Sequence, residues 1–350
     1  MVDYIVVGLG LAGTSFCETL RKNNKEYVVY NDDSQTSSLV AGGISNPVIL
    51  KRFTLAWHAK ELLPIANSFY AKFEKEFSVK LNSELPVLRR LNSIEEQNSW
   101  FQATDKPSLK RFLATTLVHN KNLNIDAPFD FGEVLCTTKL DTRLLIETYK
   151  KYLLTNHQLV TESFEHGKVV INNDYVEYKE LKARKIVFAE GYGLKFNSYF
   201  NYLPLQGSKG EYLIIKSSAL KEINAVKSSI FIIPLGDDLY KIGANYERWD
   251  KTNLPTNEAK MELLNKLDAT IKCSYEVVGH EAGIRPTISD RRPLLGKHPE
   301  HDKFAILNGF GSHGVMIAPW ASEHLYHYLE NGKHLNQEVD IERFKSKSNL

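Results

Sequence analysis

The sequence predicts an α/β protein in which a nucleotide-binding domain is combined with a second, β-rich α+β domain. Three observations predict this fold class. The chain opens with a strand, a glycine turn, a helix and a strand, and it closes with another strand, glycine loop and helix. Between these units the pattern changes to short alternating strands. At 350 residues the chain can hold one large domain or two medium ones.

The opening unit carries three glycines with the spacing G-x-G-x-x-G between apolar runs at 4–7 and 27–30. This is the strand–turn–helix–strand context of a dinucleotide-binding fingerprint. Gly8 permits the tight turn and Gly10 lets the backbone approach a pyrophosphate. Gly13 lets the helix lie close to the sheet, so the N–H groups at its start face the phosphates.

The second strand ends at Asn31, where such folds normally carry an acid for the ribose hydroxyls. Asn31 can still hydrogen-bond a hydroxyl, and Asp32 can take the part of the acid. No arginine follows to hold a 2′-phosphate, so NADP is disfavoured. The small residues from Ser37 to Pro47 fit a surface loop and a close backbone approach to a cofactor equally well. The turn Ala189-x-Gly191 after a later strand adjoins a cofactor or is simply a turn.

Periodicity and end signals predict the elements in between. Helices are expected over 54–77 (kinked or divided in two at Pro64), 93–102, 108–117, 141–154 with Asp141 as N-cap, and 257–267. Strands are expected over 85–91, 169–171, 175–178, 185–188, 211–216, 229–234, 239–243 and 275–284. The β-rich part is interpreted as a discontinuous second domain: 1–80, 140–205 and 285–350 form the nucleotide-binding domain, and 81–139 and 206–284 the substrate domain.

A second strand, glycine loop and helix lie at 304–307, 308–314 and 315–329. A protein that binds only NAD(P) has less need of this unit than one whose cofactor extends to a reactive ring. The start of the helix can present N–H groups and a positive dipole to the N1–C2 carbonyl edge of a reduced flavin. Upstream, Arg285 ends a strand before a proline. It is either a surface ion-pairing residue or a fork that binds a substrate carboxylate.

These motifs, taken in order, resemble the D-amino-acid-oxidase family of FAD-dependent oxidoreductases nearly end to end. The matching segments are Gly8-x-Gly10-x-x-Gly13, Ala41-Gly42-Gly43-Ile44, Ala189-x-Gly191, Gly207-x-x-Gly210, Ile242-Gly243-Ala244-x-Tyr246-Glu247, Gly283-Ile284-Arg285-Pro286, Asp290-x-x-Pro293-x-x-Gly296 and Gly309-x-Gly311-Ser312-His313-Gly314-x-x-x-Ala318-Pro319.

The resemblance implies a Rossmann-like domain of the glutathione-reductase type that holds FAD. It implies cofactor-binding residues Gly8, Gly10, Leu11, Ala12, Gly13, Asn31, Asp32, Ala41, Gly42, Gly43, Ile44, Ala189, Gly191, Gly309, Phe310, Gly311, Ser312, His313, Gly314, Val315 and Met316. Arg285 is the implied carboxylate-binding residue, and Tyr246 and His313 are further candidates for the catalytic site. No cysteine lies between Arg285 and His313, so the FAD is expected to be noncovalent.

Three functional hypotheses follow. The first is oxidation of the C–N bond of an amine or small amino acid by hydride transfer to flavin N5, with imine hydrolysis and reoxidation by oxygen or another acceptor. The second is oxidative removal of a side group from a tRNA wobble uridine, which a basic rim around the pocket would favour. The third is a flavin-binding protein without catalysis.

Composition adds limits to these hypotheses. With 44 basic and 42 acidic residues, the net charge of +2 gives no argument of its own for nucleic acid. Cys17, Cys136 and Cys273 are far apart and have no metal-binding spacing, which predicts a reducing compartment and no metal site. The sequence shows neither a secretory signal nor a membrane-spanning run, so a cytoplasmic location and no membrane partner are expected.

Overall fold

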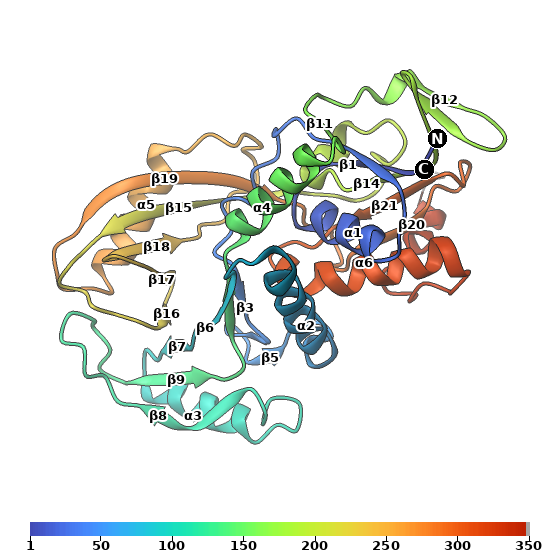
Figure 1. Cartoon of the computed structure of the whole chain (residues 1–350). Coiled ribbons are helices and arrows are strands. Elements are labelled where there is room, and N and C mark those ends of the chain that lie inside the picture. Colours follow the sequence, from blue (N-terminus) through green and yellow to red (C-terminus); the bar gives the residue numbers. More distant parts are fainter. Residues whose placement is uncertain (348–350) are drawn as a thin grey trace.

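A computed structural model describes residues 1–347 of the chain. It contains two large sheets that lie next to each other, with the helices α1 (Leu11–Lys22), α2 (Ala59–Phe77) and α6 (Gly314–Asn331) beside the first (Figure 1). The first sheet has eight strands: β1 (Val2–Val7), β2 (Tyr27–Tyr30), β11 (Leu159–Val160), β12 (Val169–Ile171), β13 (Val176–Tyr178), β14 (Leu181–Phe188), β20 (Leu294–Lys297) and β21 (Phe304–Asn308).

The centre of this sheet is parallel, in the order β11-β2-β1-β14-β21. The first half of β14 pairs with β13 in an antiparallel hairpin, and its second half pairs with β21. The carboxyl ends of parallel strands lie at one edge of a sheet, which is where such folds bind ligands. Gly8, Asn31, Ala189 and Gly309 each follow one of these strands. Four distant parts of the chain therefore meet at one edge.

Alternation along β1 explains why both faces of this sheet are covered. Tyr4 and Val6 belong to a core formed with α1, α2 and α6, whereas Ile5 and Val7 belong to a second core on the opposite face. Pro64 lies inside α2, which begins at Ala59 because the preceding Thr54–Leu55 forms strand β5. Among residues 1–347, no helix is long and apolar enough to cross a membrane.

The second large sheet has the order β19-β15-β18-β17-β16-β7-β9-β8, and its long strands β19 and β15 curve visibly in Figure 1. Its strands are β7 (Val87–Arg90), β8 (Leu113–Val118), β9 (Phe131–Val134), β15 (Ser208–Lys216), β16 (Ala225–Lys227), β17 (Phe231–Gly236), β18 (Leu239–Gly243) and β19 (Glu276–Arg285). A third core lies between this sheet and α5 (Asn257–Asp268). The domain boundaries stated above remain a prediction.

Smaller elements complete the chain. The strands β3 (Ile44–Ser45), β10 (Thr138–Leu140) and β6 (Asn82–Glu84) form a third sheet, and β4 (Val48–Ile49) pairs with β5. The helix α4 (Thr142–Thr155) begins as predicted, because the Asp141 carboxylate accepts a hydrogen bond from the Leu144 N–H at 2.9 Å. The helix α3 (Ile94–Thr104) is capped in the same way by Ser93.

The helix expected over 108–117 is wrong. Residues 113–118 form β8, an edge strand that pairs with β9. Two consecutive threonines and a valine in this segment favour extended backbone, and pairing with a neighbouring strand outweighs the weak helical spacing of its leucines. Residues 105–112, between α3 and β8, form turns and a bend rather than a helix.

A partly buried ion cluster joins α6 to the first sheet and gives a stability prediction. Burial by itself would raise the pKa of Glu330, but hydrogen bonds from Lys25, Tyr4 and Lys185 outweigh it and hold the pKa at about 2. The stabilisation is present above the unfolded-state pKa near 4.5 and is lost as the pH falls toward 2. We expect Glu330→Gln to lower the free energy of unfolding by about 3 kcal/mol at pH 7.

Denaturant titrations at several pH values measure this effect. The difference between the parent protein and Glu330→Gln should shrink as the pH falls below about 4.5. Glu165→Gln is the matched control, because the Glu165–Lys168 pair is exposed and screened by solvent, so its loss should change the stability little. A Glu330→Gln protein as stable as the parent at pH 7 would contradict the prediction.

Candidate active site

A cavity of about 1570 Å³ lies between the carboxyl edge of the first sheet and the second sheet. Most small-molecule pockets measure about 300–1,000 Å³, so this one has room for a dinucleotide and a second ligand. All the candidate site residues named from the sequence line it, with the one exception of Gly13. The sequence motifs therefore meet at one place, although their individual roles remain predictions.

The first glycine turn is shaped by close backbone contacts. Gly8 has φ +97°, and a Cβ there would lie 2.6 Å from the Ala189 carbonyl oxygen. A Cβ on Gly13 would lie 2.0 Å from the Gly8 carbonyl oxygen. Gly13 thus brings α1 against the turn without facing the cavity. The N–H of Ala12, at the start of α1, has no hydrogen-bond acceptor within the described residues and is free to bind a phosphate.

Asn31 and Asp32 both line the cavity, and both have partners in the protein. The Asn31 Oδ1 atom accepts a hydrogen bond from the Leu9 N–H at 3.0 Å, so the side chain fixes the glycine turn. Asp32 accepts hydrogen bonds from Ser34 N–H and the Ser163 hydroxyl. Burial alone would raise the pKa of Asp32, but these hydrogen bonds outweigh it and the pKa is lowered. Asp32 is therefore an ionised carboxylate at neutral pH.

Two site residues escaped the sequence interpretation. The Ser38 hydroxyl accepts a hydrogen bond from the Leu11 N–H at 3.1 Å and lies 3.0 Å from a Cβ placed on Gly10. Asn308 is buried. Its side-chain N–H donates a hydrogen bond to the Gly191 carbonyl at 2.9 Å, and its Oδ1 atom accepts one from the Gly309 N–H. A polar residue at the end of the buried strand β21 was the available signal for Asn308. For Ser38, the only signal in the sequence was that it lies in a segment of small residues.

The start of α6 faces the cavity without a side-chain cap. The N–H groups of Gly314 and Val315 have no acceptor among residues 1–347, so they can donate to a developing negative charge. Burial, and secondarily the nearby charge of Arg291, lower the pKa of His313. The His313 imidazole is therefore neutral at pH 7, and the positive potential at this helix start comes from the backbone.

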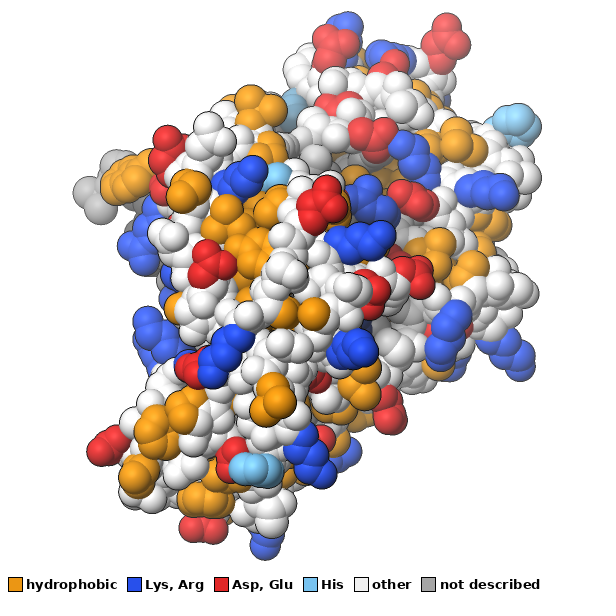
Figure 2. Space-filling model, turned by 90° about the vertical axis from the view of Figure 1, so that its left-hand side faces the viewer, with side chains coloured by type: hydrophobic (Ala, Val, Ile, Leu, Met, Phe, Trp, Pro, Cys, Tyr) orange, Lys and Arg blue, Asp and Glu red, His pale blue; other side chains and the backbone are white. Residues whose placement is uncertain are grey.

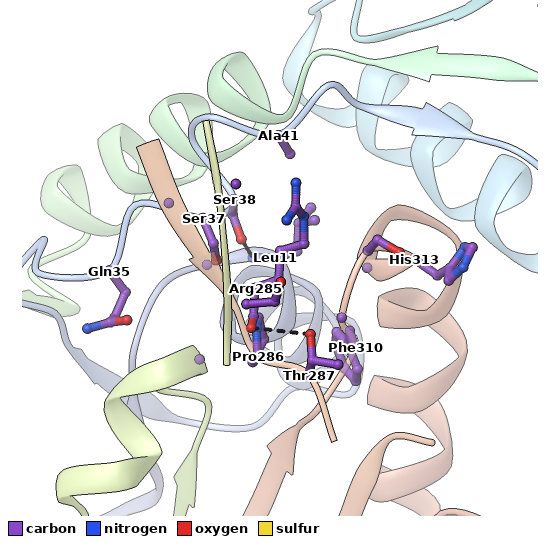
Figure 3. A pocket seen from close by; sticks show the side chains of 18 of the residues that line it. Leu11, Gln35, Ser37, Ser38, Ala41, Arg285, Pro286, Thr287, Phe310 and His313 are labelled. Carbon is purple, nitrogen blue, oxygen red and sulfur yellow. Dashed lines mark hydrogen bonds between the residues drawn. The ribbon is translucent and has the colours of Figure 1, made fainter. Parts of the chain in front are cut away.

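Arg285 ends β19 and projects into the cavity (Figure 3). Its guanidinium lies 4.6 Å from the centre of the Tyr246 ring, a cation–π contact. It also lies over Gly210, where a Cβ would be 2.0 Å from the Arg285 Nη2 atom. No carboxylate of the described residues comes within 4 Å of this guanidinium. The guanidinium donates one long hydrogen bond, from Nη1 to the Lys209 carbonyl at 3.4 Å. The surface ion-pair alternative is thus wrong, and the remaining N–H groups of the fork can bind an anion.

The loop over 244–256 extends along the mouth of the cavity and carries Tyr246, which is 69% exposed. Lys209, fully buried on β15, forms an ion pair with Asp250 of this loop. The Asn253 side chain donates to the Ser34 carbonyl at 2.8 Å, on the other side of the mouth. These contacts hold Tyr246 over Arg285 at the opening, where it can contact a substrate.

Charge is unevenly distributed around the cavity. The acidic side chains that line it are Asp32, Glu162 and Glu190. Asp32 follows Asn31 and accepts a hydrogen bond from Ser163, the neighbour of Glu162. Glu190 contacts His166 of the same segment, so all three acids lie toward the Asn31 end. The basic side chains that line it are Lys51, Lys227, Arg248, Arg285, Arg291 and Arg292. Within the described residues, only Arg292 among these has a carboxylate within 4 Å, Glu338 at 3.7 Å. The cavity wall away from the Asn31 end is therefore electropositive and favours anionic ligands.

The fold and site define a dinucleotide-dependent oxidoreductase, and the comparisons name its family. The chain belongs to the FAD dependent oxidoreductase family, whose model matches residues 3–327. Its cofactor is FAD, and the residues around the cavity fit this group: a glycine turn with a free N–H, an ionised carboxylate shortly after the second strand, and an uncapped helix at the far end. That the FAD is noncovalent remains a prediction.

The chain is similar to glycine oxidase of Bacillus subtilis, with 22% identity over 96% of this chain and 95% of that protein. It is also 21% identical, over 52% of this chain, to the tRNA 5-methylaminomethyl-2-thiouridine biosynthesis bifunctional protein of Legionella pneumophila, of which the match covers 31%. Glycine oxidase from Geobacillus kaustophilus has a similar fold, with a TM-score of 0.80 at 16% identity over 95% of each chain.

Proposed function

We propose that this protein oxidises the C–N bond of an amine that carries a carboxylate, such as a small amino acid. The observation that carries the proposal is the unpaired Arg285 in the cavity, held by Tyr246 and Gly210. A guanidinium fork binds a carboxylate through two parallel hydrogen bonds, so it can orient an α-carbon toward the cofactor. The full-length similarity to glycine oxidase supports the same substrate class.

The chemistry divides between cofactor and protein. FAD, when bound, accepts a hydride at flavin N5 and passes two electrons to oxygen, which becomes hydrogen peroxide. The substrate amine loses a hydride and a proton to become an imine, and water hydrolyses the imine to a carbonyl compound and an amine. Arg285 binds the carboxylate throughout. The free N–H groups of Gly314 and Val315, at the start of α6, can donate hydrogen bonds to the negative charge that develops on the cofactor when it is reduced.

Anaerobic reduction of the purified flavoprotein tests this function. We expect one or more of glycine, sarcosine, D-amino acids and proline to bleach the flavin absorbance, and oxygen to restore it with formation of peroxide. Acetate serves as the control, because it has a carboxylate but no oxidisable amine. A flavin that no amine or modified nucleoside reduces would exclude oxidase activity and favour a non-catalytic flavin-binding protein.

A second candidate function is oxidative removal of a side group from a modified tRNA nucleoside. The basic end of the cavity and the partial similarity to the tRNA-modifying protein favour it. On the face shown in Figure 2, however, basic and acidic side chains are interspersed rather than separated into one broad basic patch. Binding of tRNA that weakens steeply with salt, with flavin reduction by a tRNA carrying the modified uridine, would support this candidate.

A further inference from the structure

Lys227 is a second cation of the cavity wall that the proposed chemistry does not use. It ends β16, and its ammonium donates a hydrogen bond to the Ser229 carbonyl at 3.1 Å and lies 4.9 Å from the centre of the Phe231 ring. All three residues line the same cavity as Arg285. No carboxylate of residues 1–347 lies within 4 Å of the Lys227 ammonium.

A partly buried ammonium without a counter-ion is unfavourable, because burial removes water from the charge, and one carbonyl hydrogen bond and one ring contact replace that hydration only in part. Burial, with the nearby charges of Arg89 and Lys266, lowers the pKa of Lys227 to about 8. The other cations of the mouth are either exposed, as Lys51 and Arg248 are, or paired, as Arg292 is. Lys227 therefore stands out as a built position for an anion.

The sheet places Lys227 far from Arg285. They lie on β16 and β19, which are separated by the strands β17, β18 and β15. Four interstrand spacings amount to about 19 Å across the sheet. The register adds about 13 Å along the strands, because Arg285 pairs with Ser208, whereas Lys227 is aligned with Tyr212. The curvature of the sheet and the length of the two side chains shorten the gap between the charged groups. A small amino acid bound at Arg285 nevertheless does not extend to Lys227, whereas an amine with a long substituent does.

We propose that Lys227 binds an anionic group of the substrate that is remote from the reacting carbon. The substrate is then a glycine-like amine whose nitrogen or side chain carries a long tail ending in a carboxylate or a phosphate. This inference rests on the proposed amine oxidation, and it deepens that function by naming the substrate class. The apolar rings and backbone between the two cations, from Phe231 to Tyr212, form the wall along which the tail lies.

Turnover of a ladder of N-substituted glycines tests the proposal in the FAD-loaded protein. The tails increase in length and end in a carboxylate, a phosphate or a methyl group. At one length we expect the kcat/KM for an anionic tail to exceed that for the methyl tail by about tenfold or more. A preference for phosphate indicates a nucleotide-like substrate, and a preference for carboxylate an amino diacid. Equal values at every length would overturn the proposal.

Variants identify the residue responsible. Lys227→Met should reduce the anionic-to-neutral ratio of kcat/KM to near one, and Lys227→Arg should restore part of it. Lys216→Met is the matched control, because Lys216 is an exposed lysine at the end of β15 and does not line the cavity. A ratio that Lys227→Met leaves intact would overturn the assignment.

Binding of unreactive analogues separates this inference from the proposed function. In these analogues a methylene group replaces the amine nitrogen, and the perturbation of the flavin absorbance reports their dissociation constants. If no amine reduces the flavin but anionic tails still bind about tenfold more tightly than methyl tails, and only with Lys227 present, amine oxidation fails and the anion site stands. If only an amine carried on tRNA is oxidised, and no small tail is preferred, the proposed substrate class is wrong.

Discussion

We expect Arg285→Ala to raise the KM for a carboxylated amine by about 100-fold, because a charge-assisted pair in a partly buried site contributes roughly 1.5–3 kcal/mol. Steady-state oxygen consumption measures this. Arg285→Lys should recover only part of the loss, since an ammonium cannot bind both carboxylate oxygens as a planar fork does. Flavin content should remain that of the parent protein, which shows that the loss concerns the substrate.

Gly210→Ala tests the same contact from the opposite side. The added Cβ would lie 2.0 Å from the Arg285 Nη2 atom, so the guanidinium has to move while its charge is retained. We expect a higher KM for the carboxylated amine with little change in stability, because the displaced atoms are the end of a flexible side chain. Arg184→Ala, at an exposed position of β14, is the control. An unchanged KM in Arg285→Ala would remove Arg285 from the substrate site.

The free state of Arg285 explains why this site could be predicted only in part. The sequence places Arg285 at a strand end, but it does not show whether a carboxylate neutralises it. The nearest acidic residues in the sequence are Glu281 and Asp290, yet Glu281 is paired with Lys241 and Arg143, and Asp290 with Arg343. Whether a cation is paired depends on which strands become neighbours, and strand order is a property of the whole fold.

Local patterns were predictable for a related reason. The contact of Gly13 with the Gly8 carbonyl and the cap at Asp141 depend on residues a few positions apart, so the sequence around them contains the whole interaction. By contrast, Ser38 meets Leu11 from 27 positions away and Asn308 meets Gly191 from 117 positions away. Such contacts have no periodic signal. The strand β8 was missed because its partner strand, rather than its own spacing, decides its conformation.

Gly13→Ala should abolish flavin binding and destabilise the fold, although Gly13 does not line the cavity. The new Cβ would lie 2.0 Å from the Gly8 carbonyl oxygen, which is backbone and cannot move aside as a side chain can. The helix α1 must therefore shift away from the turn, at a cost of about 3 kcal/mol or more. Measured flavin content and thermal unfolding should both fall.

Two further glycines separate packing from cofactor contact. A Cβ on Gly10 would lie 3.0 Å from the Ser38 hydroxyl, a side-chain atom, so Gly10→Ala should keep the fold while its methyl group obstructs the pyrophosphate. A Cβ on Gly167 would meet nothing within 4 Å, so Gly167→Ala should retain both flavin and stability. If Gly13→Ala bound flavin as Gly167→Ala does, the close approach of α1 to the turn would not be what forms the FAD site.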